Sequence, residues 1–276
     1  MNKPMIIPSA EALKIQVLTL AQWTKGCTWR AELQHSSEAH ALVHVTRGQG
    51  LCTIMGKRRG IGVNNVMIIP AGNMFSIELG RAGFGQVCLI PPGGLTMLAD
   101  EPVHLRLRDV SEQAELTAIF DVLQREQSTA RLFMDEAMQA HASLLSIWLR
   151  RTLDCEGGDR CKIPAAERLI NAYAAVIERD FKTGKPMAEY ARILGVTPTH
   201  LARCCRQVSG LSAAEMITRR TLYAALEMLE ETREPIRQIA RLLGFNSAAY
   251  FSRFISHHTG NTPSALRKAG STKVLA

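Results

Sequence analysis

Two stretches near the C-terminal end of the chain place hydroxyl and arginine side chains just after a glycine turn. In each stretch an alanine and a leucine precede the glycine, and a hydroxyl residue, a large apolar residue and an arginine follow it. The first contains Ala191, Leu194, Gly195, Thr197, Leu201, Arg203, Gly210 and Ser212, and the second contains Ala240, Leu243, Gly244, Ser247, Phe251, Arg253, Gly260 and Thr262. Matching residues lie 49 positions apart before the turn and 50 apart after it. The sequence therefore predicts two helix-turn-helix units in tandem.

The second helix of the first unit has a polar side suited to nucleic acid. Thr197 is the expected N-cap and Pro198 fits the first turn, while Leu201, Cys204 and Cys205 form the apolar side. The outward positions are Thr199, His200, Ala202, Arg203, Arg206 and Gln207. Arginine makes paired hydrogen bonds to guanine, glutamine does so to adenine, and threonine contacts a thymine methyl group or a phosphate. We therefore expect this helix to read bases.

The corresponding helix of the second unit is less polar. Ser247 is its expected N-cap, and Tyr250, Phe251, Phe254 and Ile255 make up its apolar residues. Its outward positions include Ala248, Ala249, Ser252 and Arg253. Alanines permit a close approach to thymine methyl groups but donate no hydrogen bonds. The second unit is therefore predicted to discriminate bases weakly, apart from the contribution of Arg253.

Length and charge also favour double-stranded DNA as the partner of this part of the chain. Residues 213–231 read as one helix of roughly 28 Å, of the order of the ~34 Å between successive major grooves on one face of a duplex. Residues 164–276 carry 16 Lys and Arg against 9 Asp and Glu, whereas residues 1–163 carry 17 against 16. Nearly all the excess positive charge thus accompanies the two units. A helical bundle that binds no nucleic acid would leave the repeat and the charge distribution as coincidences.

The first half of the chain shows a different pattern. Short alternating or apolar runs, separated by glycine-bearing turns, lie at 27–35, 41–46, 50–55, 66–70, 74–79 and 86–91 and predict an antiparallel sandwich or barrel. Residues 111–153 show helical spacing, and their broad apolar stripe is suited to packing on the barrel, on a sister subunit, or on both. The polar, glycine-bearing stretch that follows reads as a linker, and Pro164 begins the next helix.

Composition narrows the setting. The chain of 276 residues is 46% hydrophobic, yet it contains no apolar run long enough to cross a membrane and no secretory signal pattern. We expect a cytoplasmic protein with no membrane partner. Its seven cysteines suit a reducing compartment better than a disulfide framework. Cys155 and Cys161 flank two glycines, and the sequence leaves open whether they form a redox pair or two inert thiols.

Residues 164–268 resemble the AraC/XylS family of transcription regulators. The segment IRQIARLLGFNSAAYFSRFISHHTGNTPSALRK carries the resemblance through its IA, GF, serine cap, YFSR-F and G-TPS elements. The resemblance implies a DNA-binding regulator, most often an activator that works with RNA polymerase, and it assigns base contacts to Thr199, His200, Ala202, Arg203, Ala248, Ala249, Ser252 and Arg253. Ile255 and Ser256 stand where the family usually has lysine or arginine, which implies weaker phosphate anchoring by the second unit.

The first half more faintly resembles the cupin-like effector domain of that family, through VTRGQG and IIPAGN. Metal-binding cupins present an HxH pair with further ligands, but this chain has no HxH, and Asn73 stands where a histidine often follows the turn. His40 and His44 share a strand face without a third ligand, so we expect no metal and no cofactor. The candidate effector contacts, for which plain core is the alternative, are Trp29, His35, Phe75 and Ile77.

These observations predict a two-domain α+β protein that acts as a homodimer. Its parts would be an antiparallel β cupin-like barrel with following helices (1–153), a linker (154–163), an all-α DNA-binding domain with two helix-turn-helix units joined by a long helix (164–268), and a disordered tail (269–276). The leading hypothesis is a transcription regulator whose first half binds a small effector. The alternatives are a cupin-type metal-dependent enzyme fused to a DNA-binding domain, and a protein-interaction module that binds no small molecule.

Overall fold

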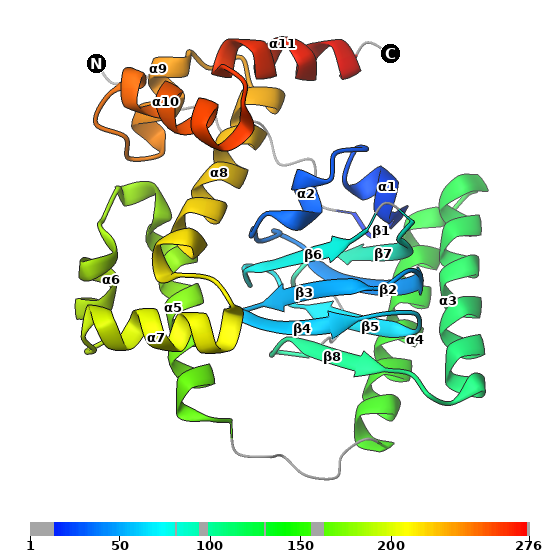
Figure 1. The fold of residues 1–276 in the computed structure, drawn as a ribbon. Coiled ribbons are helices and arrows are strands. Elements are labelled where there is room, and N and C mark those ends of the chain that lie inside the picture. The colour runs from blue at the N-terminus through cyan, green and yellow to red at the C-terminus, as the bar shows by residue number, and fades with distance from the viewer. Residues whose placement is uncertain (1–13, 81, 94–98, 130, 156–162, 275–276) are drawn as a thin grey trace.

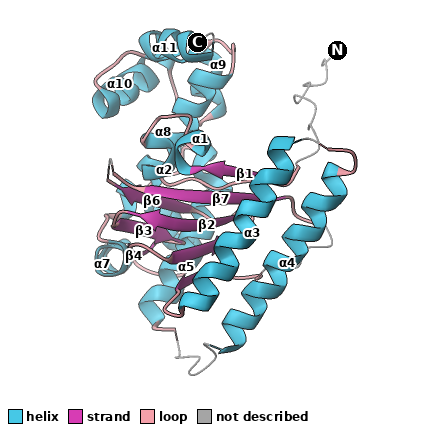
Figure 2. Cartoon of the chain, turned by 90° about the vertical axis from the view of Figure 1, so that its right-hand side faces the viewer, coloured by secondary structure: helices cyan, strands magenta, loops and turns pink. Residues whose placement is uncertain are grey.

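The computed structural model describes residues 14–80, 82–93, 99–129, 131–155 and 163–274. β-sheets form the centre of the first half, with helices α3 and α4 on one side (Figures 1 and 2). The second half consists of helices α5 to α11: α5 to α7 lie on the opposite side of the sheets, α8 rises from them, and α9 to α11 lie above the sheets in this view (Figure 1). No helix in the described ranges is both long enough and apolar enough to cross a membrane.

Eight strands within the described residues form two antiparallel sheets. The five-stranded sheet has the order β1-β7-β2-β5-β8, and the three-stranded sheet has the order β4-β3-β6. Their bounds are β1 Gln16–Thr19, β2 His40–Arg47, β3 Gly50–Ile54, β4 Lys57–Ile61, β5 Asn65–Ile69, β6 Phe75–Leu79, β7 Phe84–Ile90 and β8 Val103–Arg106. Among the described strands, hydrogen-bonded pairs form only within each sheet and not between the two sheets. The expected barrel is therefore not closed, and the two sheets form an open arrangement.

The five-stranded sheet is covered on both faces, which explains its apolar runs. Along β2, Leu42 packs in one core with the helices, whereas Ala41 and Val43 pack in a second core with the three-stranded sheet. Every residue of β5 is buried. A strand covered on both faces reads as a continuous apolar run, and the alternation of buried and exposed residues disappears.

The sequence prediction was wrong in two places in this half. Residues 27–35 contain helix α2 (Trp29–Glu32), preceded by helix α1 (Leu20–Trp23), and only His35 makes a bridge to a strand. The buried positions Cys27, Arg30 and Gln34 are three and four residues apart, which is helical spacing hidden beneath an apparent alternation. The glycine-bearing stretch between the predicted runs at 50–55 and 66–70, which was expected to be a turn, contains β4.

Helices α3 (Val110–Thr129) and α4 (Met134–Cys155) pack together on the five-stranded sheet (Figure 2). Their buried side includes Leu116, Phe120 and Leu123 from α3 and Met138, Leu145 and Leu149 from α4. Part of the predicted stripe is not covered within this chain: Leu144 is 52% exposed and Phe133, just before α4, is 67% exposed. Two edges of the helical segment therefore remain uncovered in this chain.

The second half consists of helices. They are α5 Ala165–Asp180, the 3-10 turn η1 Phe181–Thr183, α6 Met187–Ile193, α7 Pro198–Ser209, α8 Ala213–Glu231, α9 Ile236–Leu242, α10 Ala248–Thr259 and α11 Pro263–Val274. The expected disordered tail from residue 269 is instead helical as far as Val274, where α11 continues along α8. Most of the predicted linker, including Cys161, lies outside the described residues.

The two halves pack directly against each other. Met74, between two strands, belongs to the same core as α5, α7 and α8. Gly56 approaches α5 so closely that a Cβ atom there would lie 2.4 Å from Cγ2 of Ile170. Ion pairs join Arg30 to Glu230 and Arg219 to Glu78, at 3.1 and 3.2 Å respectively. The sheets therefore contact the helices that carry the predicted DNA-binding unit.

Candidate nucleic-acid interface

The first helix-turn-helix unit consists of α6 and α7. Gly195 makes the turn with φ +67°, and the Oγ1 atom of Thr197 accepts a hydrogen bond from the His200 backbone N–H at 3.2 Å. Leu201, Cys204 and Cys205 anchor α7 in the core. The predicted contacts Thr197, Thr199, His200, Arg203, Arg206 and Gln207 are all exposed, and Ala202 is half-buried. The structure thus gathers these residues on one helix with their polar side outward.

Two of these residues contact each other. The Nη2 atom of Arg203 donates a hydrogen bond to Nδ1 of His200 at 3.2 Å, one turn earlier on α7. The Nε2 atom of His200 lies 3.8 Å from Sγ of Cys204. A guanidinium held by a neighbouring acceptor loses less conformational freedom when it binds. His200 is therefore placed to orient Arg203 as well as to make a contact of its own.

The second unit consists of α9 and α10. Gly244 makes the turn with φ +77°, and Oγ of Ser247 accepts a hydrogen bond from the Tyr250 backbone N–H at 3.1 Å. The predicted contacts Ser247, Ala249 and Arg253 are exposed, while Ala248 and Ser252 are half-buried. All of them lie at or after the start of α10, so the structure brings them together on one helix.

Two residues of α10 differ from what the sequence suggested. Tyr250 was expected on the apolar side, but it is 56% exposed, while its ring packs against Phe245 at 5.9 Å. An aromatic ring with a polar tip suits a half-covered position, and the hydroxyl group was the available signal. Ile255 is fully buried, so this position does not present a side chain toward DNA.

Helix α8 joins the two units and runs from the end of α7 to α9 (Figure 1). The Ser212 and Glu215 side chains cap its first turn reciprocally, and the Tyr173 hydroxyl donates to the Ala213 carbonyl at 2.7 Å. Its 19 residues span roughly 28 Å. The buried side chains along α8 fix the two recognition helices, α7 and α10, relative to each other.

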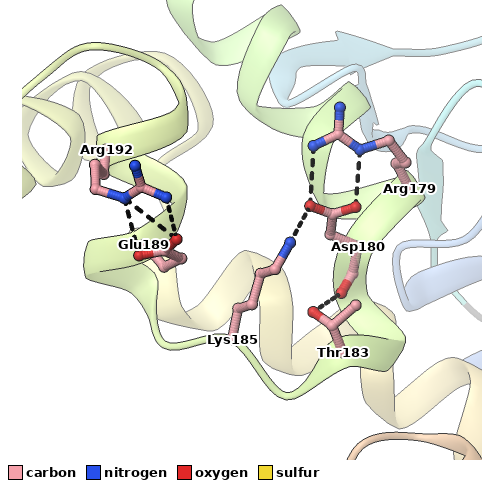
Figure 3. Close-up of polar contacts among 6 residues, drawn as sticks. All are labelled: Arg179, Asp180, Thr183, Lys185, Glu189 and Arg192. Carbon is pink, nitrogen blue, oxygen red and sulfur yellow. Dashed lines mark hydrogen bonds and ion pairs between the residues drawn. The ribbon is translucent and has the colours of Figure 1, made fainter.

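A polar network holds the loop between α5 and α6 (Figure 3). Asp180 accepts hydrogen bonds from Arg179 at 2.8 and 2.9 Å and from Lys185 at 2.8 Å. These bonds lower the pKa of the Asp180 carboxyl, and those from Arg179 contribute more than the one from Lys185. On α6, Arg192 and Glu189 form a separate ion pair (Figure 3). The arginines and lysines at the start of the first unit are thus partly neutralised by acidic neighbours.

Of the four candidate effector residues, His35 links those in the core to those that face the second half, because its ring lies 4.3 Å from that of Phe75. Phe75 and Ile77 are fully buried in the core between the sheets. His35 and Trp29 face the second half: the His35 ring stacks on Tyr223 of α8 at 4.4 Å, and Trp29 meets the same ring edge-on at 5.3 Å. Burial lowers the pKa of His35 to about 4. Of the four, His35 lines a cleft between the halves, and Ile77 lines a separate, smaller hollow.

A cleft of about 870 Å³ lies between the halves and includes one of the four, His35. Its other lining residues come from both halves and include Trp23, Ser36, Glu178, Arg220 and Tyr223. Arg220 donates to Glu178 at 2.6 and 2.7 Å, and the Ser36 hydroxyl donates to the same carboxylate at 2.7 Å. Sequence reasoning missed this cleft because the residues of each half are far apart along the chain.

The histidines weighed as metal ligands have other surroundings. Nδ1 of His40 accepts a hydrogen bond from the Ala71 backbone N–H at 3.2 Å, and His44 is buried. Within the described ranges, no three histidine, cysteine, aspartate or glutamate side chains are grouped so that they would hold a metal ion.

The geometry defines a tandem helix-turn-helix domain, and comparison with known proteins supports this class. A family model described as a helix-turn-helix domain matches residues 190–269. The chain is 27% identical over 114 residues to the bifunctional transcriptional activator/DNA repair enzyme AdaA of Bacillus subtilis, covering 40% of this chain and 54% of that protein. It is 29% identical to the probable transcription factor PqrA of Proteus vulgaris over 38% of this chain and 88% of PqrA.

A third relative also matches only part of this chain. The Escherichia coli arabinose operon regulatory protein is 32% identical over 32% of this chain and 30% of that protein. The match thus spans about half of AdaA and less than a third of the arabinose regulator. Among solved structures, apo ToxT from Vibrio cholerae covers 92% of this chain and 96% of that one, at 12% identity and a TM-score of 0.43. The matches to the helix-turn-helix region support a transcription regulator of the AraC/XylS type.

Proposed function

We propose that the protein is a sequence-specific transcription regulator that binds two successive major grooves of double-stranded DNA. The observation that carries this proposal is the exposure of polar residues on α7 and α10, at opposite ends of the rigid helix α8. Arg203 and Arg253 are the exposed arginines at matching positions of the two recognition helices. The excess of positive charge after residue 163 supplies the attraction to phosphate.

We further propose that the first half is a cupin-like effector domain acting through the cleft described above. Because both halves line that cleft, a small molecule bound there would contact α8 and the sheets together. Such a ligand shifts the equilibrium between two placements of the DNA-binding domain. The size of the shift is set by the difference between its affinities for the two placements. A compound that binds the folded state alone will raise the melting temperature, and replacement of Arg220 by lysine should reduce this shift.

We propose a homodimer formed through α4 as the active form in the cytoplasm. Leu144 and Ile147 are 52% and 41% exposed, lie three residues apart and thus share one side of α4. Burying this side against a second copy would remove apolar surface from water. Family resemblance favours activation through RNA polymerase as the outcome of DNA binding.

Selection of bound duplexes from random DNA with the full chain tests the proposed function. We expect a two-part site whose halves are one helical turn apart, because α8 separates the recognition helices by about that distance. The control is the double variant R203A/R253A, which should keep salt-dependent DNA binding and lose most of the sequence preference. Recovery of random sequence by the unmodified chain would contradict the proposal.

A further inference from the structure

The first helices of the two units differ at matching positions. Arg192 on α6 and Arg241 on α9 correspond in the repeat, because residues before the turn are 49 positions apart. By the same spacing Glu189 corresponds to Gln238, and Ala188 corresponds to Arg237. The first unit therefore has an acid and one arginine on this helix, where the second unit has an amide and two arginines.

In the first unit the arginine is paired within its own helix. Arg192 donates to both carboxylate oxygens of Glu189, with Nε distances of 3.1 and 3.2 Å and an Nη2 distance of 2.5 Å (Figure 3). The pairing lowers the pKa of Glu189, so the carboxylate stays charged at neutral pH. The net charge of the pair is zero, and the carboxylate repels any phosphate that approaches Arg192.

In the second unit the corresponding surface has no acid. Arg237, Gln238 and Arg241 line a concavity of about 620 Å³ that continues to Asn246 and Ser247, at the start of α10. No aspartate or glutamate occurs from residue 235 to residue 259, and Glu234 does not line this surface. Within the described part of the chain, Arg237 and Arg241 form no ion pair, and both are exposed. Two guanidinium groups thus face solvent beside the recognition helix.

We propose that this α9 arginine surface, made of Arg237 and Arg241, grips the phosphate backbone of DNA beside the second unit. A guanidinium group can donate two parallel hydrogen bonds to the oxygens of a phosphate. Among the residues that line the concavity, no carboxylate repels the phosphate. The second unit is anchored through this surface, and the first unit has no equivalent. The inference rests on the proposed DNA binding and adds a division of labour between the units: α7 reads bases, while α9 holds the backbone.

The test measures binding of the full chain to one selected duplex and to an unrelated duplex between 50 and 200 mM salt. Each phosphate contact adds about 0.9 to the slope of log affinity against log salt. We expect R241A to lose about one such contact, so that the affinity of the unmodified chain falls about threefold more than that of R241A over this salt range. The loss should be equal on both duplexes, since phosphate carries no sequence information.

Exchanged variants provide the matched controls. Gln238→Glu keeps both arginines and introduces the acid of the first unit, so it should weaken binding and lower the slope, whereas Gln238→Ala should not. Glu189→Gln should raise affinity on both duplexes by releasing Arg192. These side chains are exposed, and melting temperatures will confirm that each variant folds. Specific binding with slopes unchanged in both R241A and Gln238→Glu would overturn this inference alone, while a wild-type chain that binds neither duplex would overturn the proposed function too.

Discussion

The two helix-turn-helix units share a backbone plan but differ in chemistry. α7 exposes Arg203, Arg206 and Gln207, all of which can make hydrogen bonds. The exposed face of α10 includes alanine, and its hydrogen-bonding side chains include Arg253 and Tyr250. The first helices differ in the opposite sense, because α6 pairs its arginine with an acid and α9 does not. This difference fits the proposed division of labour, in which α7 reads bases and α9 holds phosphate. A repeat can keep its geometry while its copies specialise.

The surroundings of the two turns differ as well. Gly244 packs against the loop after α5, where a Cβ atom would lie 2.5 Å from the Gly184 backbone nitrogen and 2.6 Å from the Lys182 carbonyl oxygen. At Gly195, apart from the residues on either side of it in the sequence, no described atom lies within 4 Å of such a Cβ atom. The turn of the second unit is therefore braced by the loop that leads into the first, and the turn of the first unit faces open space.

The largest effect that distinguishes the units should come from these glycines. Gly195→Ala should cost ~1–2 kcal/mol of the free energy of unfolding, because its φ is unfavourable for a residue with a Cβ atom. Gly244→Ala adds a collision with backbone atoms and should cost about 2–5 kcal/mol. Urea denaturation of both variants measures the difference. Equal losses would show that the bracing of the second turn contributes nothing to stability.

The next effect concerns the arginines of the recognition helices. R203A should reduce the preference at one operator position by ~1–3 kcal/mol. R253A should reduce it by less, because His200 holds the Arg203 guanidinium in place and no neighbouring side chain in the described structure does so for Arg253. Competition between operator variants that differ at single positions measures both values. A uniform loss on all sequences for R203A would reassign Arg203 to phosphate, and a larger specific loss for R253A would reverse the ranking of the units.

The features that could be predicted from the sequence are those that local chemistry determines. The turn glycines, the hydroxyl caps and the helical spacing of Leu201 and Phe251 place both recognition helices within one or two residues. Residues 27–35 misled because alternating apolar residues suit a strand, while long-range pairing of Arg30 with Glu230 and Glu231 favours a helix that buries Arg30. Pairing over 200 residues leaves no periodic trace in a single sequence.

The candidate effector site shows the same limit. Tyr223 on α8 brings Trp29 and His35 together, but nothing near either residue in the sequence indicates that partner. Likewise, the isoleucine at position 255, where the family usually has lysine or arginine, suggested that the second unit binds phosphate weakly. In the structure Ile255 is buried, and α9 supplies two exposed arginines. Exposure, which depends on the packing of neighbouring helices, decides which residues of a motif can reach DNA.

The most direct test of the division of labour is the base preference in each half of the selected site. Selection with the full chain, repeated with R203A to identify the half read by α7, measures how strongly each position is specified. We predict several strongly specified positions in the half that loses preference in R203A, and fewer, more weakly specified positions in the other. Equal specification of both halves would contradict the account, as would a stronger half that is unaffected by R203A.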